Sequence, residues 1–149
     1  MIYKRTGKLL KKVDKLARRL YIARGKLYAA RNAYHQARAT RGVDPLIVAT
    51  ALQGIPLTRR MLGDMYQSSA DGDLAKILKE LESLKEKLKA SYFYLYVAVE
   101  SILQRILRDL SESTKQVDVE AKIEIVDRAY SSMVELRSRI DYMLRSEQR

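Results

Sequence analysis

The sequence predicts an all-α protein, and three observations support that prediction. Residues that favour helices dominate the 149-residue chain, whereas it holds only six Gly and two Pro. Hydrophobic residues make up 47% and charged residues 32%, which is typical of a folded domain. Over long stretches the apolar residues recur at steps of three and four, the helical period. The predicted order is a long basic N-terminal helix, two short helices and a long antiparallel helical hairpin.

The first predicted helix, at about 8–41, has one apolar face. Its seam alternates steps of four and three over roughly four heptads: Leu9, Val13, Leu16, Leu20, Ala23, Leu27, Ala30, Tyr34 and Ala37. At about 1.5 Å per residue the helix is about 50 Å long. Gly25 would permit a bend, and Gly42 is a suitable stop.

Two short helices are predicted next. Asp44 and Pro45 suit the N-cap and the first position of a helix, and the body of that helix, residues 46–52, is apolar all round. We therefore expect this body to be buried. A second short helix is predicted at about 58–67, and residues 68–72 (SSADG) are predicted to form a loop.

The remainder predicts a long hairpin. Asp73 is the expected cap of a helix whose apolar positions continue to Leu110, and a last helix runs from about 118 to 146. Residues 111–117 weaken the helical pattern, so we expect a turn there and an antiparallel hairpin. A lone helix of about 70 residues could not bury its own seam, although one continuous helix is the alternative.

Charge divides the chain into two parts. The formal net charge is +11, but residues 1–42 alone carry thirteen Lys and Arg against one acid, Asp14, which leaves the remainder at −1. We therefore predict a basic nucleic-acid-binding arm at 1–42 and a helical assembly body at 43–149. The predicted nucleic-acid-binding residues are the cations of the arm: Lys4, Arg5, Lys8, Lys11, Lys12, Lys15, Arg18, Arg19, Arg24, Lys26, Arg31, Arg38 and Arg41.

Three interpretations of the basic helix compete: a solvated face, a helix lying on an anionic membrane, and a helix that binds nucleic acid. A merely soluble helix normally mixes in acids, because like charges four residues apart, such as Lys8 and Lys12, repel. The apolar face of the basic helix lacks the Trp and Phe typical of membrane-surface helices. We therefore favour double-stranded DNA, bound through its phosphates without regard to sequence.

No catalytic constellation is visible in the sequence. The chain has no Cys, its one His, His35, lies among basic residues, and no phosphate-loop, dinucleotide-binding or zinc-protease motif occurs. We expect no enzymatic activity, cofactor, metal site or small-molecule substrate.

Arg59 and Arg60 fit a phosphate contact or an ordinary surface position equally well. No signal peptide or membrane-spanning segment is visible, and the composition is compatible with a thermophilic source.

An aromatic cluster in the hairpin predicts self-association. Tyr92, Phe93, Tyr94 and Tyr96 cover most of the circumference of the predicted helix in a neutral region. We favour packing against other helices over base stacking. One intramolecular partner cannot bury all four rings, so we expect copies of the chain to associate here.

In layout the chain resembles the coat proteins of filamentous and rod-shaped archaeal double-stranded DNA viruses. The residues that prompt this are Lys4–Arg41 for the arm and Asp73–Ser146 for the body. The resemblance implies a capsid protein of a virion, whose subunits polymerise around DNA held by their N-terminal helices, with or without a second coat protein.

Two alternatives remain beside this resemblance. The chain is also similar to membrane-remodelling filament proteins related to ESCRT-III, but its two short helices and the lack of an acidic C-terminal tail depart from them. A chromatin-like DNA-bridging protein, cytoplasmic and associated with the nucleoid, is the other alternative.

Overall fold

Five helices account for most of the described chain and confirm the predicted all-α class. The computed structural model describes residues 2–39 (side chains from residue 7), 44–51, 53 and 57–147. Within these residues no strand is present. The helices are α1 (Ile2–Ala39), α2 (Pro45–Ala51), α3 (Arg59–Ser91), α4 (Phe93–Lys115) and α5 (Val119–Glu147).

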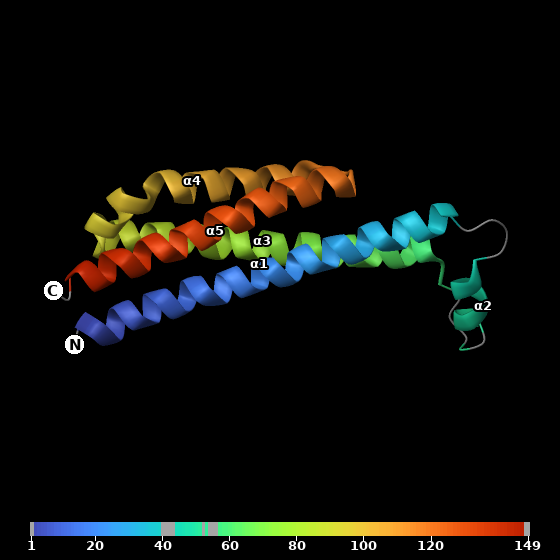
Figure 1. Cartoon of the computed structure of the whole chain (residues 1–149), viewed down its shortest axis with the longest axis horizontal. Helices are drawn as coiled ribbons and strands as arrows, with labels where there is room; N and C mark the ends of the chain where they lie inside the picture. The colour runs from blue at the N-terminus through green and yellow to red at the C-terminus, as the bar shows by residue number, and fades with distance from the viewer. Residues whose placement is uncertain (1, 40–43, 52, 54–56, 148–149) are drawn as a thin grey trace.

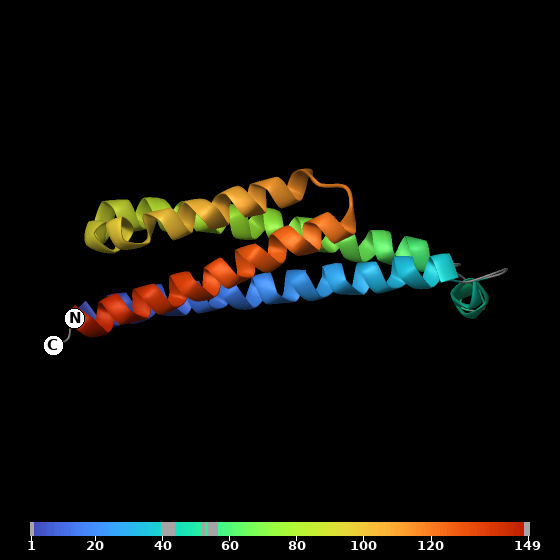
Figure 2. The same ribbon diagram turned by 45° about the horizontal axis from the view of Figure 1, so that its top comes forward.

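The four long helices form a bundle in which each runs antiparallel to its neighbours (Figure 1). α1 packs against α3 and α5, and α4 packs against the same two helices from the other side. The N-terminal end of α1 and the C-terminal end of α5 lie at the same end of the bundle. At the opposite end, α1 and α3 continue past the α4–α5 turn as a two-helix stalk, with α2 at its tip (Figure 2).

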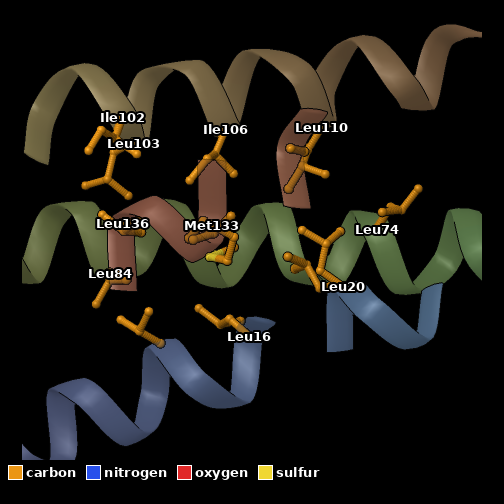
Figure 3. Packing of buried hydrophobic residues seen from close by; sticks show 14 of the residues in the cluster. Leu16, Leu20, Leu74, Leu84, Ile102, Leu103, Ile106, Leu110, Met133 and Leu136 are labelled. Carbon is orange, nitrogen blue, oxygen red and sulfur yellow. The ribbon is translucent and has the colours of Figure 1, made fainter. Parts of the chain in front are cut away.

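The predicted apolar seam of α1 is confirmed, and it faces the bundle core. Its residues from Leu9 to Ala30 are at most 1% exposed. Figure 3 shows side chains of all four long helices meeting in one interior, among them Leu20, Ile106 and Met133. Burying a leucine of this kind contributes about 1.5–3 kcal/mol. The division predicted at residue 42 therefore separates a basic segment from a nearly neutral one, but not two hydrophobic cores, because α1 shares one core with α3, α4 and α5.

The predicted loop at residues 68–72 is wrong, since α3 runs without a break from Arg59 to Ser91. The Thr58 hydroxyl caps this helix by accepting a hydrogen bond from the Met61 backbone N–H at 3.0 Å. Ala70 is fully buried and continues the apolar seam to Leu74. Tertiary packing thus outweighs the weak helical preference of Ser, Asp and Gly, and the second short helix becomes the first part of α3.

The chain reverses direction at Tyr92, where the sequence predicted an uninterrupted helix. Tyr92 has φ −139° and ψ 55°, outside the helical region. Its N–H donates to the Leu88 carbonyl at 2.8 Å, and its own carbonyl accepts from the Tyr96 N–H at 3.0 Å. One residue therefore closes α3 and opens α4. The second reversal, at 116–118, confirms the predicted turn and the antiparallel hairpin of α4 and α5.

The expected burial of residues 46–52 is wrong for the part that the structure describes. The cap is as predicted, because Asp44 accepts a hydrogen bond from the Leu46 N–H at 2.9 Å. No residue of α2 is buried, however, and Val48 is 53% exposed. The reason is the position of α2 at the stalk tip, beyond the reach of α4 and α5. The predicted stops at Gly42, Gly54 and Pro56 lie outside the described residues.

Arg59 and Asp44 tie α2 to the start of α3. The Arg59 backbone N–H donates to Asp44 Oδ2 at 2.8 Å, and its guanidinium contacts Asp44 Oδ1 at 3.3 Å and also Gln36. These interactions, the backbone hydrogen bond foremost, lower the pKa of Asp44. Arg59 is therefore occupied within the fold, whereas Arg60 is exposed.

Tyr34 of α1 lies over Gly63 of α3, beside the α4–α5 turn where the stalk begins. Its hydroxyl donates to Asp64 Oδ1 at 2.5 Å and contacts Gln67 Oε1 at 3.0 Å. Burial, and then the hydrogen bond to Asp64, raise the pKa of Tyr34 to about 12. A Cβ atom at Gly63 would lie 2.7 Å from Tyr34 Cε1, whereas one at Gly72 would meet open space.

This contrast predicts different effects of the same substitution at two sites in α3. Both Gly63→Ala and Gly72→Ala gain about 1 kcal/mol of helix propensity. Gly63→Ala also displaces a hydrogen-bonded ring, for which overpacking costs typically about 1–3 kcal/mol. We expect Gly72→Ala to raise the free energy of unfolding, measured in urea. The free energy of unfolding of Gly63→Ala should be about 1–3 kcal/mol lower than that of Gly72→Ala. Equal stabilisation by both would contradict the described seating of Tyr34.

Candidate nucleic-acid interface

Cations on one flank of α1 are neutralised by acids of α3. Lys26 Nζ lies 2.6 Å from Asp73 Oδ2, and Arg19 Nη1 lies 2.6 Å from Glu80 Oε1. The partners are seven residues apart on both helices, so the pairs recur at one heptad along the antiparallel interface. Asp73, expected as a helix cap, is instead the partner of a lysine inside α3.

The other flank of α1 is tied to α5 in the same way. Arg24 Nε lies 2.5 Å from Asp127 Oδ1, and Arg31 Nη1 lies 3.9 Å from Glu120 Oε2. The Tyr28 hydroxyl also donates to Asp127, and both arginines stack against the Tyr28 ring. The hydrogen bond to Asp127 is the main cause of the raised pKa of Arg24. The α1 segment from Arg24 to Arg31 therefore packs against α5 within the same bundle.

The remaining cations gather in the first half of α1. Among the described residues, no carboxylate forms an ion pair with five closely spaced side chains, which we call the cationic stripe: Lys8, Lys11, Lys12, Lys15 and Arg18. Arg38 likewise has no ion-pair partner among the described residues but stands apart, near the other end of α1. The side chains of Lys4 and Arg5, and all of Arg41, lie outside the described residues.

The cationic stripe follows the outer face of α1. Lys8, Lys11, Lys15 and Arg18 are exposed at steps of three and four, and Lys12 is half-buried beside them. The stripe spans about 15 Å at 1.5 Å per residue, so neighbouring charges lie within about one Debye length. Asp14, the one acid nearby in sequence, accepts a hydrogen bond from Arg137 of α5 at 2.7 Å. Like charges are therefore concentrated on a rigid helix without local compensation.

The aromatic residues predicted for self-association do not share one surface. Tyr96 is buried under Lys89, whose Nζ lies 5.2 Å from the ring centroid, and Tyr92 packs against the core. Phe93 is 64% and Tyr94 40% exposed, and the Tyr94 hydroxyl donates to Glu147 at 2.7 Å. Sequence reasoning missed Val97, which is 60% exposed. It stands four residues after Phe93, so Phe93, Tyr94 and Val97 form what we call the apolar end patch.

The polar groove between α4 and α5 offers no comparable charge. It has a volume of about 760 Å³ and is lined by three arginines and four acids. Arg105 pairs with Glu135 at 3.0 Å and Arg128 with Asp109 at 3.8 Å. In the described part of the chain, no cluster of three or more His, Cys, Asp or Glu is placed to hold a metal ion. None of the described helices combines the length and apolar character needed to span a membrane. His35 is exposed and lies 3.3 Å from Glu120.

Comparison of the chain with known protein families, curated proteins and solved structures finds no match. A functional hypothesis therefore rests on the charge and geometry described above. Two features stand out among the described residues: a cationic stripe without acidic partners and an apolar end patch.

The division of α1 into paired and unpaired cations predicts different effects on stability. Arg24→Gln removes an ion pair and ring contacts, and we expect it to lower the free energy of unfolding by about 1 kcal/mol. Lys15→Gln removes repulsion between neighbours four residues apart, so stability should rise by a few tenths of a kcal/mol, about 0.2–0.5. Urea unfolding at low ionic strength measures both. A loss with Lys15→Gln as large as that with Arg24→Gln would mean that the stripe also stabilises the fold.

Proposed function

We propose that this chain is a non-enzymatic structural protein that binds the phosphate backbone of double-stranded DNA and associates with copies of itself. Arrayed along a duplex, such subunits form a nucleoprotein filament, and the role that we propose is that of a coat protein in a virion. The observation that carries the proposal is the cationic stripe, in which five cations share one helix face without an acidic partner among the described residues.

The ion pairs of α1 narrow the proposed binding site. Arg19, Arg24, Lys26 and Arg31 already contact carboxylates, so phosphate would have to displace an internal partner from each of them. The stripe residues meet no such competition, and their neutralisation by DNA would relieve repulsion and release counterions. Five phosphate contacts correspond to a slope of log K against log salt near −4.5.

The burial of the α1 seam favours nucleic acid over a membrane surface. A helix lying on lipid inserts an apolar face about 5–10 Å deep. The seam residues of α1 from Leu9 to Ala30 are at most 1% exposed, because α3 and α5 cover them. Insertion would require the bundle to open, whereas phosphate binding uses the outer face as it stands.

Substituting stripe residues should weaken duplex binding and reduce its salt dependence. In Lys11→Gln/Lys15→Gln/Arg18→Gln, two of the five cations remain, so the slope should fall from near −4.5 to near −1.8. Fluorescence anisotropy with a labelled random-sequence duplex, repeated across a salt series, measures both the affinity and the slope.

The matched control removes three exposed cations from other helices: Lys79→Gln/Lys115→Gln/Arg139→Gln. It has the same net charge as the stripe variant and should retain most of the wild-type slope. Equal losses in the two variants would show that overall charge, not the stripe, drives binding. Wild-type protein that binds anionic vesicles but no duplex would overturn the proposal in favour of a membrane surface.

We assign the proposed self-association to the apolar end patch. Phe93 and Val97 lie one helical turn apart on α4 and are each at least 60% exposed. Apolar side chains presented together in this way are typical of interaction surfaces. The patch lies at the same end of the bundle as the stripe, since α1 begins where α4 begins. Association through it therefore brings the stripes of neighbouring copies to one region.

Phe93→Ser/Val97→Ser should lower the mass measured by light scattering at high protein concentration, because it removes apolar area from the contact. The control is Met61→Ser/Met65→Ser, which replaces two exposed apolar residues of the stalk at the same four-residue spacing. Its mass should follow that of the wild type. Unchanged mass in the Phe93/Val97 variant, or a wild type that stays monomeric with and without DNA, would contradict this assignment.

A further inference from the structure

The two ion pairs between α1 and α3 define a register that extends beyond them. Lys26–Asp73 and Arg19–Glu80 are successive rungs, each seven residues from the next on both helices. Because the helices are antiparallel, the next rung toward the N-terminus of α1 joins position 12 to position 87. Both positions hold lysine.

The faces of α3 support this register. Leu84 and Leu88 point into the core with no exposure. Lys89, one residue after Leu88, contacts Tyr96 of α4, so that flank of α3 faces α4. Glu80 contacts Arg19, so the other flank faces α1. Lys87 is one heptad from Glu80 and shares its flank, on which it is exposed.

The third rung therefore differs from the first two, because it has a lysine on both helices instead of a cation and an acid. A groove of about 390 Å³ opens between α1 and α3 beside the first two rungs, lined by Arg19, Ile22, Lys26, Asp73, Lys76, Ile77 and Glu80. One heptad further along, and leaving aside the Arg19–Glu80 pair that the two sets of positions share, the corresponding outer positions hold Lys12 and Lys15 of α1 with Ser83 and Lys87 of α3. Three cations and no acid occupy these positions. Within the bundle alone, facing lysines are unfavourable.

We infer that the DNA-binding surface extends from the cationic stripe across the α1–α3 interface one heptad beyond this groove, where Lys12 and Lys87 together bind one backbone phosphate. The inference rests on the proposed function and adds a residue from a helix outside the basic segment. A phosphate oxygen between the two ammonium groups takes the place of the acid that the other rungs have. Ser83, at the adjoining outer position, supplies a hydroxyl that can donate a hydrogen bond to the same anion.

Lys87→Glu tests the inference because it should move stability and affinity in opposite directions. The new carboxylate completes the ladder with Lys12, so the melting temperature without DNA should rise by about 1–2 °C. Duplex binding should weaken by about fivefold or more. In Lys87→Gln, Lys12 still contacts the phosphate, so affinity should fall by less than in Lys87→Glu while the salt slope stays near −4.5. Lys79, exposed on the same helix, gives the matched controls Lys79→Glu and Lys79→Gln.

Both readouts can overturn the inference. A melting temperature that falls in Lys87→Glu would show that positions 12 and 87 do not face each other. Wild-type protein that binds DNA through the stripe, with Lys87 variants that match their Lys79 controls, would confine binding to α1 and leave the proposed function intact. Wild-type protein that binds no duplex would overturn both proposals together.

Discussion

Burial of the α1 seam fixes the surroundings of every other side chain on that helix. Leu9, Val13, Leu16 and Leu20 face the core with essentially no exposure, so the flanks of α1 must lie against α3 and α5. A face about 100° wide is thereby committed to packing. The charged residues can occupy only the two flanks and the outer face, and their chemistry follows from which of these they occupy.

On the flanks, charge serves to align helices. Each exposed or half-exposed pair contributes only about 0.2–1 kcal/mol, which is small beside the burial of the leucines. The pairs with Asp73 and Glu80 on one side and with Asp127 and Glu120 on the other nevertheless favour the observed register, because the four pairs form together only in that register. On the outer face no such partner exists among the described residues, and the same residue types become available to another molecule.

Local periodicity was enough to predict the helices but not their relations. The apolar seam of α1 and the turn between α4 and α5 follow from sequence spacing. The reversal at Tyr92 could not be predicted, because a single non-helical residue without Gly or Pro leaves no compositional signal. The loop predicted at 68–72 failed because the buried contact of Ala70 is a tertiary interaction.

The candidate site was predicted only in part for the same reason. All cations of residues 1–42 are equivalent in a charge count. Arg24 nevertheless differs from Lys15, because it forms an ion pair with Asp127, which lies 103 positions away along the chain. That distinction requires the register between helices. Composition therefore located the basic helix, and the bundle decides which of its charges remain available.

The two-helix stalk divides the molecule into parts of unequal rigidity. Beyond the α4–α5 turn, α1 and α3 have only each other and α2 as neighbours, whereas the first half of α1 lies in the four-helix part of the bundle. Backbone amides protected by fewer packed layers open more often, so hydrogen exchange should proceed from the stalk toward the opposite end. The cationic stripe therefore stands on a part of the chain that we expect to exchange more slowly than the stalk, and a ligand bound there meets a preorganised surface.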